Sequence, residues 1–211
     1  VRQKAATERA AAIAVEANYS EFKNCSFMSS QDTLFLGSEY GYFQNCLVEG
    51  NTDYIFGSGT YVFDSCELRF KGYSGSSAGG YITANKNAGR TLFTNCSVTA
   101  ASGLVVSPGY FGRPWGDSPD VAFVNTKLQY EGIITGAGWT KMSNNAPENA
   151  KFKEYDDGEN DYSGNYVPFV PMHTINAAIE IPVNVGKNKT FAGNVAAIYI
   201  ISLSTFKIKC L

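Results

Sequence analysis

The sequence is poor in the side chains on which common hydrolytic centres depend. It holds a single histidine, His173, and its five cysteines form no CxxC pair and no cysteine–histidine cluster with zinc spacing. Ser-His-Asp and Cys-His catalysis both need a histidine base beside the nucleophile, and His173 lies far along the chain from the polar motifs described below. These absences argue against serine hydrolases, cysteine hydrolases and structural zinc sites.

Charge is also scarce, since 17% of the residues are charged and the formal net charge is −2. Without a basic surface, nucleic acids and acidic membranes are poor candidate partners, and no apolar run approaches the ~20 residues of a membrane span. We therefore expect a monomer that binds a neutral or weakly charged partner. The chain begins at Val1 without a signal-peptide pattern, so we expect a fragment or a processed form, and this start says nothing about secretion.

A short strand-like pattern recurs along the first two thirds of the chain. It alternates apolar and polar residues, and successive copies begin 21, 20, 30 and 30 residues apart. The copies are Phe22–Phe27, Phe43–Val48, Phe63–Leu68, Phe93–Val98 and, with Thr126 in place of cysteine, Phe123–Leu128. Periods of this length indicate a solenoid. One β unit per ~20 residues, always in the same direction, predicts an all-β, right-handed parallel β-helix; a sandwich or propeller would need antiparallel hairpins with Asn-Gly turns, which are scarce.

Residues that hold the same position in successive copies of the repeat, and so have the same phase, should stack in columns along the coils. The phenylalanines should form an inward column, and the asparagines should hydrogen-bond along the coils as a ladder, which makes glycosylation at the two N-x-Ser sequences improbable. The cysteines should pack as small apolar groups, although a disulfide between adjacent coils would fit the spacing. The asparagines are Asn24, Asn45, Asn95 and Asn125, and the cysteines are Cys25, Cys46, Cys66 and Cys96.

We divide the chain into a β-helix over residues 1–165 and a tail over residues 166–211. The Gly- and Ser-rich runs Lys71–Gly80 and Ala100–Gly109 explain the two 30-residue steps, and we expect them to form loops beside a groove. The tail ends in the apolar run Val195–Phe206 and follows no regular scheme.

The same phase argument places three ionisable groups together. Asp32 and Asp53 each lie ten residues after a column phenylalanine, so they should be neighbours on successive coils. Asp53, Thr83 and Arg113 each lie ten residues before the next column phenylalanine. This spacing places Arg113 two coils beyond Asp53 on the same face. Two close carboxylates share a proton, giving one acid and one base or nucleophile, and Arg113 would hold Asp53 charged. The plainer alternative is a surface carboxylate pair with a salt bridge.

Aromatic and amide side chains accompany this constellation. Trp115 and Trp139 lie in glycine-rich loops, where flat rings suit stacking on sugars, although core packing is the alternative for both. Phe56 would supply a small apolar pocket or pack in the core. Gln31 offers an amide N–H for a developing oxyanion, or a place in an amide ladder.

Four sequence blocks, in order, resemble the signature blocks of pectin methylesterases. They are Gln31-Asp32-Thr33-Leu34, Asp53-Tyr54-Ile55-Phe56-Gly57, Tyr81-Ile82-Thr83-Ala84 and Gly112-Arg113-Pro114-Trp115, followed by Gly138-Trp139, and the similarity covers about 70% of the chain, from Arg9 to Tyr155. The resemblance implies a parallel β-helix enzyme that removes methyl esters from homogalacturonan without a metal or cofactor. It implies a secreted protein of the extracellular space or cell wall that lacks the N-terminal part of the family's domain.

The resemblance also implies a role for each matching residue. Asp53 would attack the ester, Asp32 would act first as acid and then as base, and Gln31 would bind the oxyanion. Arg113 would anchor Asp53, and Trp115 and Trp139 would line the substrate groove. Arg9 stands where the family usually has a second glutamine, and we expect its side chain to reach the groove.

Two other functions are compatible with such a fold. A pectate lyase-like enzyme would cleave the polymer by elimination, but it needs a cluster of acidic residues for Ca²⁺, and only two carboxylates share the groove phase. A catalytically impaired, pectin-binding β-helix is the second alternative, and Arg9 favours it.

Overall fold

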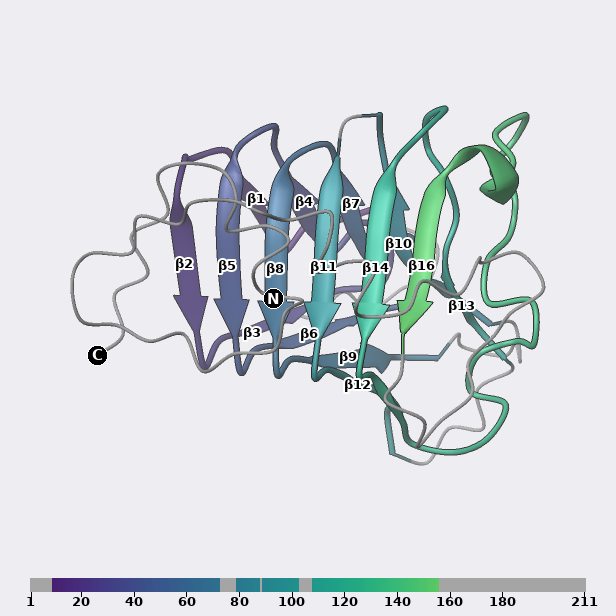
Figure 1. The fold of residues 1–211 in the computed structure, drawn as a ribbon. Coiled ribbons are helices and arrows are strands. Elements are labelled where there is room, and N and C mark those ends of the chain that lie inside the picture. The colour runs from purple at the N-terminus through teal and green to yellow at the C-terminus, as the bar shows by residue number, and fades with distance from the viewer. Residues whose placement is uncertain (1–8, 73–78, 88, 103–107, 156–211) are drawn as a thin grey trace.

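A computed structural model of the chain describes residues 9–72, 79–87, 89–102 and 108–155. The described chain winds through repeated coils, and each complete coil contributes one strand to each of three parallel sheets (Figure 1). This is the predicted parallel β-helix. None of the described segments forms a helix with the length and apolarity that a membrane crossing requires.

The three sheets are named here by the order in which the chain enters them. The first sheet contains β1 (Ile13–Val15), β4 (Leu34–Leu36), β7 (Ile55–Gly57), β10 (Tyr81–Asn85) and β13 (Tyr110–Gly112). The second contains β2 (Ser20–Lys23), β5 (Tyr40–Gln44), β8 (Thr60–Asp64), β11 (Arg90–Thr94), β14 (Asp120–Val124) and β16 (Lys151–Tyr155). The third contains β3 (Ser26–Met28), β6 (Leu47–Gly50), β9 (Glu67–Phe70), β12 (Ser97–Ala100) and β15 (Lys127–Leu128). A single 3-10 turn, Pro147–Asn149, precedes β16.

The predicted phenylalanine column is confirmed. The column residues pair in register along the second sheet, and neighbouring rings stack with centroids 4.7, 4.5, 4.9 and 4.3 Å apart. The column consists of Phe22, Phe43, Phe63, Phe93 and Phe123. All except the first are almost fully buried, so the column forms the axis of the core. Since each ring packs on the next, the strand spacing of the coils fixes the stacking distance.

The cysteine column is also present, and its members are free thiols. Cys46, Cys66 and Cys96 are buried, and each thiol donates to the carbonyl oxygen of the column phenylalanine one coil earlier, at 3.4–3.5 Å. The thiols therefore pack as small apolar groups with a weak hydrogen bond, and the disulfide alternative is not realised in the described coils.

The asparagines lie at equivalent turns of the coils, as the sequence suggested. Asn24, Asn45, Asn95 and Asn125 all have left-handed backbones, with φ between 50° and 56°, and the first three side chains are exposed. Ser65 occupies the equivalent place in another coil, with φ of 55°. Asparagine is common here because its side chain tolerates the left-handed region at a sharp turn. The amide ladder, and the argument against glycosylation that rests on it, stay predictions.

The two long insertions fall between strands, and their expected place beside the groove stays a prediction, whereas β16 was not anticipated. The runs Lys71–Gly80 and Ala100–Gly109 separate a third-sheet strand from the next first-sheet strand, and parts of both lie outside the described residues. β16 adds a sixth strand to the second sheet by pairing with β14, in a region where the sequence repeat fades (Figure 1). The predicted tail, residues 166–211, lies outside the described residues.

Candidate active site

The two candidate carboxylates lie in the turns that lead from the third sheet into the first. Asp32 precedes β4 and Asp53 precedes β7. Their neighbours Gln31 and Thr52 form a parallel bridge, and Asp32 N donates to Thr52 O at 3.0 Å, so the two aspartates occupy equivalent places on adjacent coils. The sequence prediction that they are neighbours is therefore confirmed.

Both aspartates have left-handed backbones, with φ of 59° at Asp32 and 51° at Asp53. Aspartate and asparagine are among the few residues other than glycine that accept this conformation readily. The turn thus fixes the direction in which each carboxylate leaves the backbone, and both reach one groove on the outer side of the first sheet.

Arg113 binds Asp53 through two parallel hydrogen bonds. Its Nε donates to Oδ1 at 2.8 Å and one terminal nitrogen donates to Oδ2 at 2.7 Å, while the guanidinium lies 4.0 Å from the ring centroid of Tyr81. Arg113 follows Gly112, and a Cβ at that glycine would overlap Thr83 Oγ1, so the β13 backbone can lie this close to β10 only without a side chain. The fork holds the Asp53 carboxylate, whose side chain is 10% exposed, in one orientation.

The predicted contact between Arg113 and Asp53 is present, but the predicted register of Arg113 along the coils is wrong. Thr83 pairs with Ile55 and Gly112, so Arg113 lies in register with Phe56 rather than with Asp53. From β7 onward, the loops that leave the first sheet lengthen from coil to coil, with two residues after β7 (58–59), four after β10 (86–89) and seven after β13 (113–119). Counting backwards from the phenylalanines assumed loops of equal length. The long arginine side chain spans the remaining distance across β10.

Asp32 has a different electrostatic environment. Burial raises the pKa of the Asp32 carboxyl and the charge of Asp53 raises it further, whereas Arg9, a side-chain hydrogen bond with Gln31 and the charge of Arg113 act in the opposite direction. The Arg9 ion pair is loose, with 3.8 Å between Nε and Oδ2 and an Arg9 side chain that is 78% exposed. The site thus combines a carboxylate oriented by an arginine fork with a second carboxyl whose pKa is raised, which is the arrangement that nucleophile and acid require.

These groups line a groove of about 500 Å³, within the range typical of ligand sites. The groove brings together seven of the eight predicted site residues: Arg9, Gln31, Asp32, Asp53, Phe56, Arg113 and Trp115. Phe56 points outward from β7, between the ring of Phe35 at 5.2 Å and that of Trp115 at 6.1 Å. An aromatic row therefore borders the acidic centre.

Trp139 is the exception, and its placement contradicts the prediction that it lines the groove. Its side chain is fully buried, stacks on Phe152 at 4.0 Å and donates from Nε1 to Glu154 at 3.0 Å. Trp139 forms a bridge with Gly112 whose register turns the indole inward. It therefore closes the end of the core, which was the alternative considered from the sequence.

Some residues of the groove were not among the predicted site residues. Ala84, Met142 and Ser143 line the groove, and Tyr81 supports Arg113. Ala84 pairs with Phe56, so its small side chain leaves the space that the groove occupies. Met142 and Ser143 belong to an irregular turn after the last complete coil, where the repeat offers no register to count from.

In the part of the chain that the structure describes, no three His, Cys, Asp or Glu side chains converge in a way that could hold a metal ion.

Comparison with known proteins gives a consistent result. The family described as Pectinesterase matches residues 2–182. "Probable pectinesterase A" of Aspergillus niger is 34% identical over 142 residues, which cover 66% of this chain and 42% of that protein. The chain spans only about half the length of the curated relatives that it matches, or less.

Solved structures of the same kind resemble the described coils. The pectin methylesterase from Aspergillus niger in deglycosylated form matches with a TM-score of 0.59 and 32% identity, covering 69% of this chain and 48% of that one. A pectin methylesterase in complex with hexasaccharide VII matches with a TM-score of 0.62 and 26% identity, covering 82% of this chain and 58% of that one.

Proposed function

Because the chain belongs to the pectinesterase family, we propose that it removes methyl esters from homogalacturonan and releases methanol. The observation that carries this proposal is the unequal pair of carboxylates in one groove. Arg113 holds Asp53 through two hydrogen bonds of 2.7 and 2.8 Å, while burial and Asp53 raise the pKa of Asp32. Such a pair supports covalent ester hydrolysis without a histidine.

The first half of the proposed reaction is acylation. An Asp53 oxygen attacks the ester carbonyl carbon, and the carbonyl oxygen takes the negative charge of the tetrahedral intermediate. Gln31 lies beside Asp32 and supplies an amide N–H for that oxyanion. The intermediate then collapses, the bond to the methoxy oxygen breaks, Asp32 gives its proton to this oxygen, and methanol leaves an acyl-enzyme anhydride.

The second half is hydrolysis of the anhydride. Asp32, now ionised, takes a proton from a water molecule as the water oxygen attacks the acyl carbon. The bond to Asp53 breaks, the galacturonic acid unit leaves and loses its proton to solvent, and both aspartates return to their starting protonation states. Asp32 therefore serves first as acid and then as base, a role that suits the carboxyl whose pKa is raised.

The groove also suits a carbohydrate polymer. Phe56 and Trp115 border Asp53 with aromatic surface that can pack against sugar rings. A similar enzyme has been solved with a hexasaccharide, and relatives occur in fungi and plants. We therefore place the protein outside the cell, at plant cell-wall pectin; retention of the native protein inside its cells would contradict this.

Methanol release tests the proposal and separates it from its alternatives. With methylated pectin, the chain should release methanol and acidify the solution, and Asp53→Asn should do neither. An ultraviolet-absorbing unsaturated end without methanol would identify a lyase instead. Binding of pectin without either product would identify a catalytically impaired binding protein, and the Arg9–Asp32 ion pair would be its first candidate cause.

A further inference from the structure

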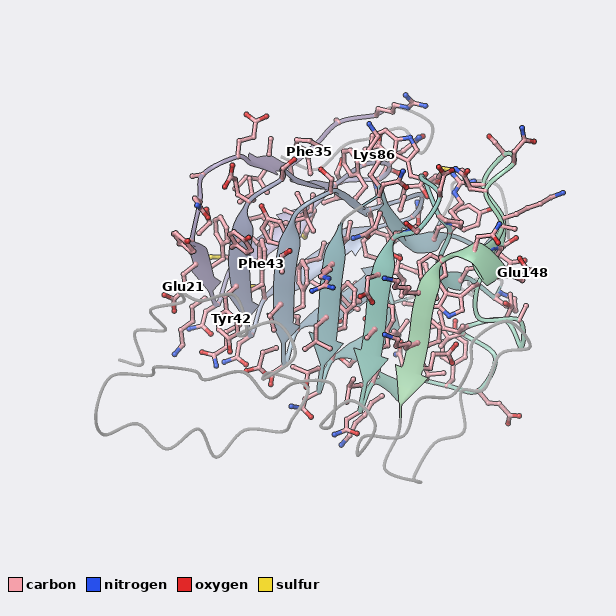
Figure 2. All side chains as sticks on the ribbon, turned by 45° about the horizontal axis from the view of Figure 1, so that its top comes forward. Glu21, Phe35, Tyr42, Phe43, Lys86 and Glu148 are labelled. Carbon is pink, nitrogen blue, oxygen red and sulfur yellow. The ribbon has the colours of Figure 1, made fainter. Side chains whose placement is uncertain are left out.

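Lys86 lies at the rim of the groove and was not part of the predicted site. It is the first residue after β10, and its N–H donates to Gly57 O at 2.7 Å. Its ammonium lies 4.5 Å from the ring centroid of Trp115, which is 39% exposed. Figure 2 shows Lys86 and Phe35 at the upper edge of the molecule, whereas Glu21 and Tyr42 lie towards the lower left. Lys86 thus accompanies the aromatic row of Phe35, Phe56 and Trp115.

The charge of Lys86 has no acidic counterpart among the described residues. Its side chain makes no ion pair with those residues, and its ammonium group lies over the aromatic face of Trp115. A cation over an exposed ring is held only weakly, so it can exchange that contact for a carboxylate at little cost. Arg113 differs in this respect because it is already bound to Asp53.

The groove as a whole is more positive than the chain that forms it. Three cations lie in it or at its rim, Arg9, Lys86 and Arg113, against the two carboxylates of the catalytic centre, whereas the whole chain has a formal net charge of −2. Arg9 lies one coil before Asp32, and Lys86 follows the strand one coil beyond Asp53. A polymer running along the coils would therefore meet a cation on either side of the reacting ester.

We infer that Lys86 is a specificity residue that binds the free carboxylate of a galacturonate unit packed against Trp115. This inference rests on the proposed function and extends it, because the preferred ester would be one that lies next to a unit already demethylated. Each turnover creates a free carboxylate, so the product would recruit the enzyme to the neighbouring ester.

The test compares defined oligogalacturonates that carry one methyl ester between either free or methylated neighbours. The wild-type chain should show a higher kcat/KM with free neighbours, and Lys86→Gln should lower this preference about 2- to 5-fold, the range for an exposed ion pair, chiefly through KM. Lys86→Arg should restore most of it, and added salt should weaken it. Lys127→Gln, an exposed lysine on β15 of the third sheet, is the matched control and should leave the preference unchanged.

Calorimetric binding of fully demethylated oligogalacturonate provides a readout that needs no turnover. Lys86→Gln should bind it about 2- to 5-fold more weakly than the wild type or Lys127→Gln. Equal affinities, or an unchanged preference in kcat/KM, would overturn the role of Lys86. Absence of methanol from every ester would instead overturn the proposed function, and the binding comparison would still decide the question of Lys86.

Discussion

The fork between Arg113 and Asp53 offers the sharpest test of the proposed site. Arg113→Lys keeps the positive charge but loses the planar pair of donors, so one of the two bonds of 2.7 and 2.8 Å is lost. A hydrogen bond to a charged group contributes about 1.5–3 kcal/mol. If the fork orients the nucleophile in the transition state, that loss corresponds to a fall in kcat of about 10- to 100-fold. Because the arginine side chain is 23% exposed and water can replace part of the bond, we expect a value near the lower end.

Removing the charge altogether should affect stability as well. Arg113→Met would leave the carboxylate of Asp53 nearly buried without its partner, and such a change costs about 3 kcal/mol at the low end of the range for buried pairs. Kinetics of methanol release would measure the first effect, and urea unfolding would measure the second.

A matched control separates orientation from a general loss of packing. Arg69 on β9 also pairs closely with carboxylates, at 2.9 Å to Glu67 and 3.5 Å to Glu49, but it does not line the groove. Arg69→Lys should lower the free energy of unfolding and leave kcat unchanged. An Arg113→Lys variant with the wild-type kcat would refute the view that the fork positions the nucleophile.

Three further changes test other parts of the structure. Asp53→Asn should abolish methanol release while the chain stays folded, because an amide cannot form the acyl intermediate; turnover above a few per cent would exclude Asp53 as the nucleophile. Arg9→Gln should raise methanol release and move the alkaline limb of the pH–rate profile upward, because the charge of Arg9 lowers the pKa of Asp32 and its removal lets that acid keep its proton to higher pH. A fall of ~10²–10³ in turnover for this variant would instead identify Arg9 as an oxyanion donor. Phe93→Ala, in the middle of the stacked column, should lower the free energy of unfolding by about 3–5 kcal/mol in urea titrations, and a loss below about 1 kcal/mol would contradict its role in the core.

The repeat made much of this fold predictable from the sequence. In a parallel β-helix one register relates every coil to the next, so the spacing of Phe22 and its counterparts was enough to place the column. The same regularity placed Asp32 beside Asp53, because the path from the second sheet through the third to the first has the same length in both coils, twelve residues from Phe22 to Leu34 and twelve from Phe43 to Ile55.

The prediction failed where regularity ends. Loops of unequal length shifted the register of Arg113, and β16 lies beyond the last copy of the repeat. Trp139 follows a glycine-rich turn whose geometry the sequence does not reveal, so whether its ring faced the groove or the core could not be decided by counting. Lys86 was not predicted as a groove residue, because its contact with Trp115 joins two loops whose positions the repeat does not relate.

The left-handed backbone of Asp32 and Asp53 bears on how variants at these positions should be interpreted. An alanine there must hold its Cβ against the following carbonyl at a cost of about 1–2 kcal/mol, without a side-chain oxygen to offset it. An inactive alanine variant would therefore combine a distorted turn with a missing functional group, and alanine scanning would overstate the catalytic share of both residues. Asparagine has nearly the same shape and accepts the same φ, as four other turns of the coil demonstrate. Asparagine replacements at positions 32 and 53 should therefore remove the carboxyl chemistry and keep the turn conformation. They are the variants in which we expect an intact substrate to stay bound.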